Sequence, residues 1–294
     1  MNARTMIVEE PDEQEVLLAR LAGMWGAVAG SWADHADYAD ARGAETTERL
    51  LALSGLRPGE RALELACGPG GLGLAAARRV GPEGEVVLSD VAGAMTAVAA
   101  ARAGALGLTN VSFCDLDLER IEQPDDSYDV VLCREGLMFA LDPAGALAEI
   151  RRVLRTGGRV ALAVWGPRER NPWLGLVLDA ASAQIGAPVP PPGIPGPFAL
   201  GDADALGGLL SGAGFADVRV SELAVPLRAG SFDEWWARTS ELAGPLAAIL
   251  ASMPDEARLA LAERARDLTA AYRTPDGGLQ FPGVTLLATG RRDP

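Results

Sequence analysis

The sequence predicts an α/β fold, in which a seven-stranded and mostly parallel sheet carries helices on both faces. Short, almost wholly apolar segments alternate with helical stretches from residue 61 to residue 165. Strands of that kind belong to parallel sheets that are covered on both sides. A glycine-rich turn follows the first apolar segment, and two more strand-like segments come after a change of rhythm near residue 166. A chain of 294 residues is long enough to bury such a core.

Residues 14–54 are expected to be helical. Val16, Leu17, Leu21 and other apolar side chains recur there at helical spacing. The segment "LRPGE" at 56–60 then has the composition of a turn. The chain therefore enters the sheet only after this first helical part.

The alternating part of the chain supplies five of the seven strands. They are expected at 61–66, 85–90, 110–113, 128–133 and 158–165. Helices are expected between them at 70–80, 92–105 and 143–155. Ligands of such sheets bind at the carboxyl ends of the strands, where the winding reverses. The glycine-rich turn lies at that edge.

The rest of the chain is predicted to complete the sheet around a helical insertion. The proline-rich stretch 186–198 cannot form regular structure and is expected to be a surface connection. We expect a helix at 202–215, a strand at 216–227, helices at about 232–252 and 255–272, and a last strand at 282–292.

The charge balance argues against nucleic acid as a partner. The chain has 26 basic residues, all of them Arg, against 40 acidic ones, for a net charge of −14. It lacks the cationic surface that phosphate backbones and anionic membranes require. The N-terminal segment has acids where a signal peptide would be apolar, and no apolar run approaches the ~20 residues of a membrane span. A cytoplasmic location without membrane attachment is therefore expected.

The cysteines and the histidine predict no metal site. Cys67, Cys114 and Cys133 are widely spaced, and His35 is the only histidine. A structural zinc site or a disulfide framework is therefore not expected, and a reducing compartment fits.

The segment "LELACGPGGLGL" at 63–74 permits two interpretations. Gly68, Gly70 and Gly73 form the G-x-G-x-x-G pattern of nicotinamide-binding folds. Asp90, which lies 17 residues past Gly73, could bind the ribose of such a cofactor. The pattern alone is weak and does not exclude a nicotinamide site.

Three features favour a different, positively charged adenosine compound. Glu64 lies within the first strand, where a carboxylate would repel a pyrophosphate. Pro69 removes one N–H donor that a phosphate would need. The acids Glu64, Asp90 and Asp117, together with Cys133, fall at or just past four successive strands. Acidic side chains are thus expected along one sheet edge.

With these motifs, the chain resembles the class I S-adenosylmethionine-dependent methyltransferases, especially the group typified by ubiquinone and menaquinone biosynthesis methyltransferases. "ALELACGPGG", "VVLSD" and "NVSFCDLDLERIEQPDDSYDVVLC" match successive motifs in the family's order. The resemblance runs from about Glu60 to Trp165 and more loosely to the end. It implies a Rossmann-like sheet with an antiparallel last strand, an N-terminal lid segment at 1–55, an S-adenosylmethionine-binding core at 56–165, and substrate-lid insertions with the last two strands at 166–294.

The resemblance implies roles for the glycine-rich loop. Gly68 and Gly70 would let the backbone approach the cofactor, and Ala66 stands where the family more often has Gly. Glu64 would hold the ammonium side of the methionine portion. A paired core carboxylate is the alternative for Glu64, although its neighbours supply no obvious Arg partner.

The resemblance also implies roles at the next strand ends. Asp90 would bind both ribose hydroxyls, Met95 would pack against adenine, and the Cys133 carbonyl would face the cofactor ammonium. Asp90 as a plain helix cap and Asp117 as an ordinary loop acid remain alternatives.

The adenine-binding Asp has two candidates, Asp115 and Asp117. The family pattern places it four residues after the strand's Phe and eleven before the next aromatic residue. Phe113 and Tyr128 satisfy both counts with Asp117. We therefore assign Asp117 to the adenine amino group and the Leu118 backbone to the ring nitrogen.

The resulting hypothesis is methyl transfer by in-line displacement to a small, apolar or aromatic molecule. His35, Glu135 and Tyr38 are the candidate bases. The expected pocket residues are Trp25, Trp32, Met138, Phe139, Trp165 and Trp236. A protein of this fold that binds the cofactor without methylating, and a nicotinamide oxidoreductase, are the alternatives. The acceptor atom and the oligomeric state, a homodimer included, stay open.

Overall fold

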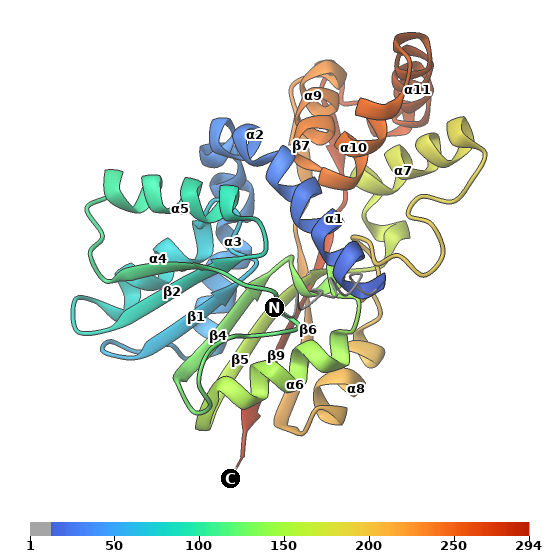
Figure 1. Ribbon diagram of the computed structural model, residues 1–294. Coiled ribbons are helices and arrows are strands. Elements are labelled where there is room, and N and C mark those ends of the chain that lie inside the picture. The colour runs from blue at the N-terminus through green and yellow to red at the C-terminus, as the bar shows by residue number, and fades with distance from the viewer. Residues whose placement is uncertain (1–12, 294) are drawn as a thin grey trace, which may run out of the picture.

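The computed structural model describes residues 13–293 and is built around one seven-stranded sheet (Figure 1). Its strand order is β3-β2-β1-β4-β5-β9-β6, and β9 runs antiparallel to both of its neighbours. The strands are β1 (Arg61–Leu65), β2 (Glu85–Asp90), β3 (Val111–Asp115), β4 (Tyr128–Arg134), β5 (Leu154–Trp165), β6 (Phe215–Ala224) and β9 (Val284–Arg292). The mostly parallel sheet with an antiparallel last strand is confirmed.

Helices cover both faces of this sheet. The α-helices are α1 (Glu13–Ala27), α2 (Ala29–Asp34), α3 (Ala36–Ser54), α4 (Gly71–Val80), α5 (Gly93–Ala105), α6 (Pro143–Val153), α7 (Pro172–Ile185), α8 (Ala203–Gly212), α9 (Phe232–Leu242), α10 (Gly244–Ser252) and α11 (Asp255–Leu268). Short 3₁₀ turns lie at η1 (Leu137–Phe139), η2 (Arg168–Arg170) and η3 (Ala270–Tyr272).

The apolar strands divide their side chains between two cores. In β1, Ala62 belongs to a buried cluster with α3, α4 and α5, whereas its neighbour Leu63 belongs to a cluster with α6, α7 and α8. In β4, Val130 and Val131 divide in the same way. Successive side chains of a strand point to opposite faces, so a strand buried on both sides must be apolar throughout.

The structure differs from the sequence prediction in several elements. The predicted helix 14–54 is interrupted at Val28 and His35, and the helix predicted at 232–252 breaks at Ala243. Pro245 lies in the first turn of α10 and has no N–H to continue the preceding helix. The strand β5 begins at Leu154, four residues earlier than expected, because Leu154 already pairs with Tyr128.

Two further elements escaped the sequence prediction. Helix α7 is apolar nearly all round and buries most of its side chains, so it shows no helical period of polar residues. A separate two-stranded ribbon joins β7 (Leu227–Ala229) to β8 (Leu279–Phe281). Both strands are too short to give a clear alternation.

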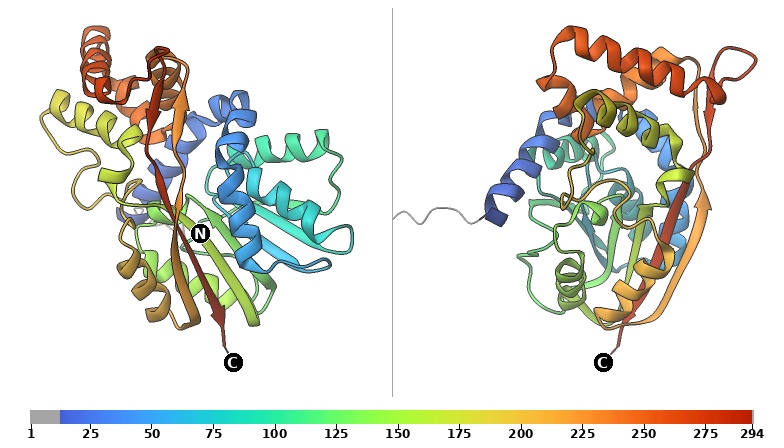
Figure 2. Two further views of the ribbon diagram at one scale, coloured as in Figure 1. Left: turned by 180° about the vertical axis from the view of Figure 1, so that it is seen from behind. Right: turned by 90° about the vertical axis from the view of Figure 1, so that its right-hand side faces the viewer.

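Helices from distant parts of the chain gather beyond the carboxyl edge of the sheet. Figure 2 shows α9–α11 at the end of the molecule opposite the C-terminus. Helix α1 contacts α10 and helix α2 contacts α9. The Trp32 indole donates to the carbonyl of Leu242 at 3.0 Å. We call α1, α2, α9 and α10 the roof. Within residues 13–293, no helix combines the length and apolarity needed to cross a bilayer.

Candidate functional site

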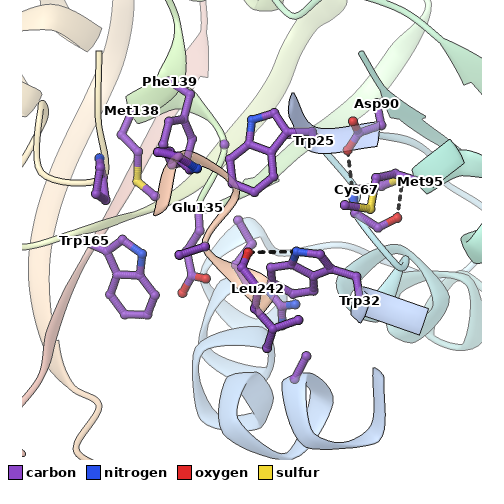
Figure 3. A pocket seen from close by; sticks show the side chains of 18 of the residues that line it. Trp25, Trp32, Cys67, Asp90, Met95, Glu135, Met138, Phe139, Trp165 and Leu242 are labelled. Atoms are coloured by element: carbon purple, nitrogen blue, oxygen red, sulfur yellow. Dashed lines mark hydrogen bonds between the residues drawn. The ribbon is translucent and has the colours of Figure 1, made fainter. Parts of the chain in front are cut away.

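A cavity of about 230 Å³ lies between the carboxyl edge of the sheet and the roof. It exceeds the ~150 Å³ cavity that takes up benzene in an engineered protein core. Twelve of the predicted site residues line it: Trp25, Trp32, Ala66, Gly68, Asp90, Met95, Asp117, Leu118, Glu135, Met138, Phe139 and Trp165. Figure 3 shows Asp90, Cys67 and Met95 on one side, and Met138, Phe139, Glu135 and Trp165 on the other. The cavity thus has two chemically different halves.

The turn between β1 and α4 brings the backbone to the cavity at Gly68. This residue has a φ of +52°, and a Cβ added there would meet no atom within 4 Å. A side chain at this position would be strained and would extend into open space. The turn leaves room for a ligand to approach the backbone directly.

The third glycine of the motif serves packing. A Cβ at Gly73 would lie 2.3 Å from a Glu64 carboxylate oxygen and 2.7 Å from Leu88 Cγ. The N–H of Gly73 donates to that Glu64 oxygen at 2.9 Å. Glycine at this position therefore allows the first turn of α4 to seat directly on a buried carboxyl group.

Glu64 lies below the turn and outside the cavity lining. Its side chain is 2% exposed. Burial raises the pKa of the Glu64 carboxyl to about 8, and the positive charge of Arg134 and the Gly73 N–H only partly oppose this. Arg134 ends the adjacent strand β4, so the basic neighbour that the sequence did not reveal is supplied by the sheet. Its predicted contact with the cofactor ammonium stays a prediction.

The free energy of unfolding of the ligand-free protein is expected to fall as the pH rises from about 4.5 to about 8. In that range the folded state keeps a proton on Glu64 that the unfolded state has released, so stability decreases with pH. Replacement by Gln keeps an acceptor for Gly73 without a titrating proton. Glu64→Gln should remove up to about 5 kcal/mol of this decline.

Chemical denaturation across this pH range measures the effect. Glu48→Gln, an exposed change on α3, is the matched control and should retain the wild-type decline. An unchanged pH dependence in Glu64→Gln would contradict the raised pKa.

Asp90 presents a buried carboxylate to the cavity at the end of β2. One oxygen accepts the N–H of Gly68 at 2.9 Å, and the other accepts the N–H of Ala92 at 3.0 Å. Burial raises its pKa, and these two N–H donors oppose the rise. An ionised carboxylate can accept about four hydrogen bonds, so acceptor capacity remains for a ligand.

The segment after β3 places Asp117 and Leu118 in the cavity lining, whereas Asp115 is absent from it. Asp117 is held by the Glu119 N–H, which donates to its carboxylate at 2.9 Å. Asp115 is exposed and accepts from the Thr96 hydroxyl at 2.6 Å. Met95, 2% exposed, also lines the cavity. The two candidate acids therefore have different surroundings.

Two residues with side chains occupy left-handed backbone conformations at the strand ends. Ala66 has a φ of +51° and Glu135 has a φ of +62°. Such conformations cost ~1–3 kcal/mol each and persist only where the surroundings impose them. A Cβ at Gly136 would lie 2.4 Å from the Ala66 methyl, so glycine at 136 makes room for alanine at 66.

Three charged side chains from different elements lie near one another in the second half of the cavity. Glu135 follows β4, Arg134 ends it and Arg42 belongs to α3. Burial raises the pKa of Glu135, and the charges of Arg134 and Arg42 oppose the rise. Figure 3 shows the Glu135 side chain between Trp165 and Trp32. Its carboxylate makes no hydrogen bond or ion pair within residues 13–293.

Besides Glu64, four predicted residues lie outside the cavity lining. His35 contacts Glu241 at 2.8 Å and joins the α2–α3 junction to α9. Trp236 stacks on Phe232 with ring centroids 6.1 Å apart. Cys133 is buried within β4, and Gly70, likewise outside the lining, caps the N-terminus of α4. Of the three candidate bases, Glu135 and Tyr38 line the cavity.

Sequence reasoning missed several lining residues. Arg42, Arg134, Trp173 and Arg238 come from α3, β4, α7 and α9. The Trp173 ring lies edge-on to Trp165, with centroids 5.1 Å apart. No local motif marks these positions. An Arg within the otherwise small-residue segment "ADARGA" was the one available signal.

This chain is similar in sequence to known methyltransferases. The sequence model of a family described as "Methyltransferase domain" matches residues 56–172. The ubiquinone/menaquinone biosynthesis C-methyltransferase UbiE of Cupriavidus necator is 39% identical over 139 residues, which are 42% of this chain and 56% of that protein. UbiE of Ralstonia pickettii is 34% identical over 183 residues, which are 57% of this chain and 74% of that protein. The chain spans little more than half the length of the first of these relatives.

Among solved structures, the YcgJ protein from Bacillus subtilis is similar to this chain with a TM-score of 0.58 and 21% identity. The match covers 85% of this chain and 99% of that one. At this level of identity the likeness shows a shared fold.

Proposed function

Because the chain belongs to the class I S-adenosylmethionine-dependent methyltransferases, we propose that it transfers a methyl group from S-adenosylmethionine to a small, apolar or aromatic acceptor. The observation that carries the proposal is the two-part cavity. Acidic side chains and an open glycine turn lie at the strand ends, and indole, phenyl and thioether groups lie beside them.

The first half of the cavity suits the nucleoside part of the cofactor. Asp90 would accept hydrogen bonds from the ribose hydroxyls with the acceptor capacity that Gly68 and Ala92 leave free. Asp117 and the Leu118 backbone would hold the adenine edge, and Met95 would pack against its ring. The open space above Gly68 supports this fit, since any side chain there would compete with the ligand.

The bound cofactor supplies a methyl group on a positively charged sulfur. The carboxylates of Asp90 and Asp117 create a negative potential that favours a cationic ligand in the first half of the cavity. Charge disperses when a methyl group leaves a cation, so alignment and exclusion of water provide much of the acceleration. The roof residues Trp25 and Trp32, which line the cavity, would keep water from the reacting atoms.

Glu135 is the residue that we propose to take a proton from the acceptor. It faces the second half of the cavity without a bonding partner among the described residues, and burial raises its pKa toward the range where a general base is effective. The neighbouring Met138, Phe139 and Trp165 would bind a flat apolar acceptor.

Calorimetric titration with S-adenosylhomocysteine, followed by transfer of a labelled methyl group to a panel of phenols, amines and activated carbon acids, tests the proposal. We expect the wild type to bind the nucleoside, and Asp117→Asn to weaken binding by about tenfold, as for one charged hydrogen bond. Asp115→Asn, two residues away and outside the cavity, should bind as the wild type does.

Absence of binding by the wild type would refute the cofactor assignment. Binding without transfer to any member of the panel would count against methylation of this acceptor class. If Asp117→Asn and Asp115→Asn changed the affinity for S-adenosylhomocysteine equally, the assignment of Asp117 to the adenine would be refuted.

A further inference from the structure

Arg42 is a cation without a bonding partner at the acceptor end of the cavity. It lines the cavity, yet none of its N–H groups donates to another residue within 13–293. Its Nη2 atom is buried and has no hydrogen-bond partner. A buried donor without a partner costs free energy, so such a group is rare unless a ligand completes it.

Two indole rings fix the position of this guanidinium. Its central carbon lies 4.0 Å from the ring centroid of Trp173 and 5.0 Å from that of Trp165. Cation–π contacts of this kind hold an Arg in place without using its N–H donors. The donors therefore remain available to a bound molecule.

The neighbouring charges do not neutralise Arg42 completely. Burial lowers the pKa of Arg42, the neighbouring Glu135 and Tyr38 oppose this, and Arg134 adds to it. No ion pair within 4.0 Å joins Arg42 to Glu135. The other cations of the lining have partners among the described residues, because Arg134 donates to the Thr47 hydroxyl and Arg238 pairs with Glu234. Within residues 13–293, the positive charge of Arg42 is the one left without a partner. An anionic group is the ligand that would balance it.

Building on the proposed function, we infer that the methyl acceptor is a flat, apolar molecule that carries an anionic oxygen, a carboxylate or a phenolate, in addition to the group that Glu135 deprotonates, and that Arg42 binds this oxygen. The rings of Trp165 and Trp173 flank the same position and shield the contact from water. A guanidinium donates two parallel hydrogen bonds to a carboxylate and one or two to a phenolate.

The test uses the full chain saturated with S-adenosylhomocysteine and two pairs of probes of equal shape. Benzoate is compared with benzamide, and para-nitrophenol with para-nitrotoluene, by calorimetry. The colour of ionised para-nitrophenol shows whether that probe binds as the phenolate. We expect the wild type to bind at least one anion more than about tenfold more tightly than its neutral counterpart, as for a charge-assisted hydrogen bond.

The variants identify the residue responsible. Arg42→Gln should remove the preference for the anion, and Arg42→Lys should keep part of it because the charge remains. Arg49→Gln, an exposed change two turns along the same helix, should leave the preference intact. If Arg42→Gln does not bind S-adenosylhomocysteine, the preference for the anionic probe is compared between Arg42→Lys and the wild type. A reduced preference in Arg42→Lys then supports the inference, and an unchanged one contradicts it.

Equal affinity for both members of each pair in the wild type would overturn the inference. So would a preference that survives Arg42→Gln. Both outcomes are read in protein that binds S-adenosylhomocysteine, so they are distinct from failure of the proposed function, in which the wild type does not bind the nucleoside.

Discussion

Asp90→Asn is expected to weaken the binding of S-adenosylhomocysteine by at least about 100-fold. The substitution keeps the size of the side chain but replaces one acceptor oxygen by an NH₂ group. That group would face either the N–H of Gly68 or the N–H of Ala92, both of which donate to Asp90. The ribose contacts lose their charge at the same time, and hydrogen bonds to charged groups contribute ~1.5–3 kcal/mol each.

Calorimetry measures this effect, and Asp115→Asn provides the control. Asp115 pairs with Asp90 across β2 and β3, so both substitutions lie at the same level of the sheet. The thermal stability of each variant shows whether the turn around Gly68 is still folded. Wild-type affinity in a folded Asp90→Asn variant would refute the ribose assignment.

Glu135→Gln is expected to lower kcat by about 100- to 10,000-fold, the contribution of a positioned general base. The affinity for S-adenosylhomocysteine should change little, because Glu135 lies in the other half of the cavity from Asp90. In the wild type, activity should rise with pH as Glu135 loses its proton, and the midpoint should lie above the ordinary Glu value since burial raises this pKa.

Two comparisons separate Glu135 from the other candidate base in the cavity. Tyr38→Phe should retain most of the activity, and the rise with pH should disappear only in Glu135→Gln. Loss of activity in Tyr38→Phe together with normal turnover in Glu135→Gln would assign the base to Tyr38.

The strands of the sheet could be predicted because a short stretch of sequence specifies each of them. The apolar runs that become β1, β2 and β4 are short and uninterrupted, and the glycine turn marks where the first of them ends. Counting from Phe113 and Tyr128 selected Asp117 over Asp115, and the structure places Asp117 alone of the two in the cavity lining. Because β1, β2 and β3 are parallel neighbours in the sheet, the acids that follow them lie along one edge.

The roof and the acceptor end were less predictable because long-range packing determines them. Trp235 and Trp236 are adjacent, yet Trp235 is 1% exposed and donates to the Trp173 carbonyl, whereas Trp236 stacks on Phe232. Neither lines the cavity, and Trp173 from the unpredicted helix α7 does. Helical periodicity shows that a helix has an apolar face but not which partner that face meets.

The Trp32–Leu242 hydrogen bond spans 210 positions of the chain and bears on how the molecule folds. Contacts of such sequence separation form late, because the loop between them must close first. During synthesis α1 and α2 leave the ribosome before the whole sheet, whereas their partners α10 and α9 follow two hundred residues afterwards. The apolar side chains of these first helices therefore stay without their final neighbours until α9 and α10 have been synthesised.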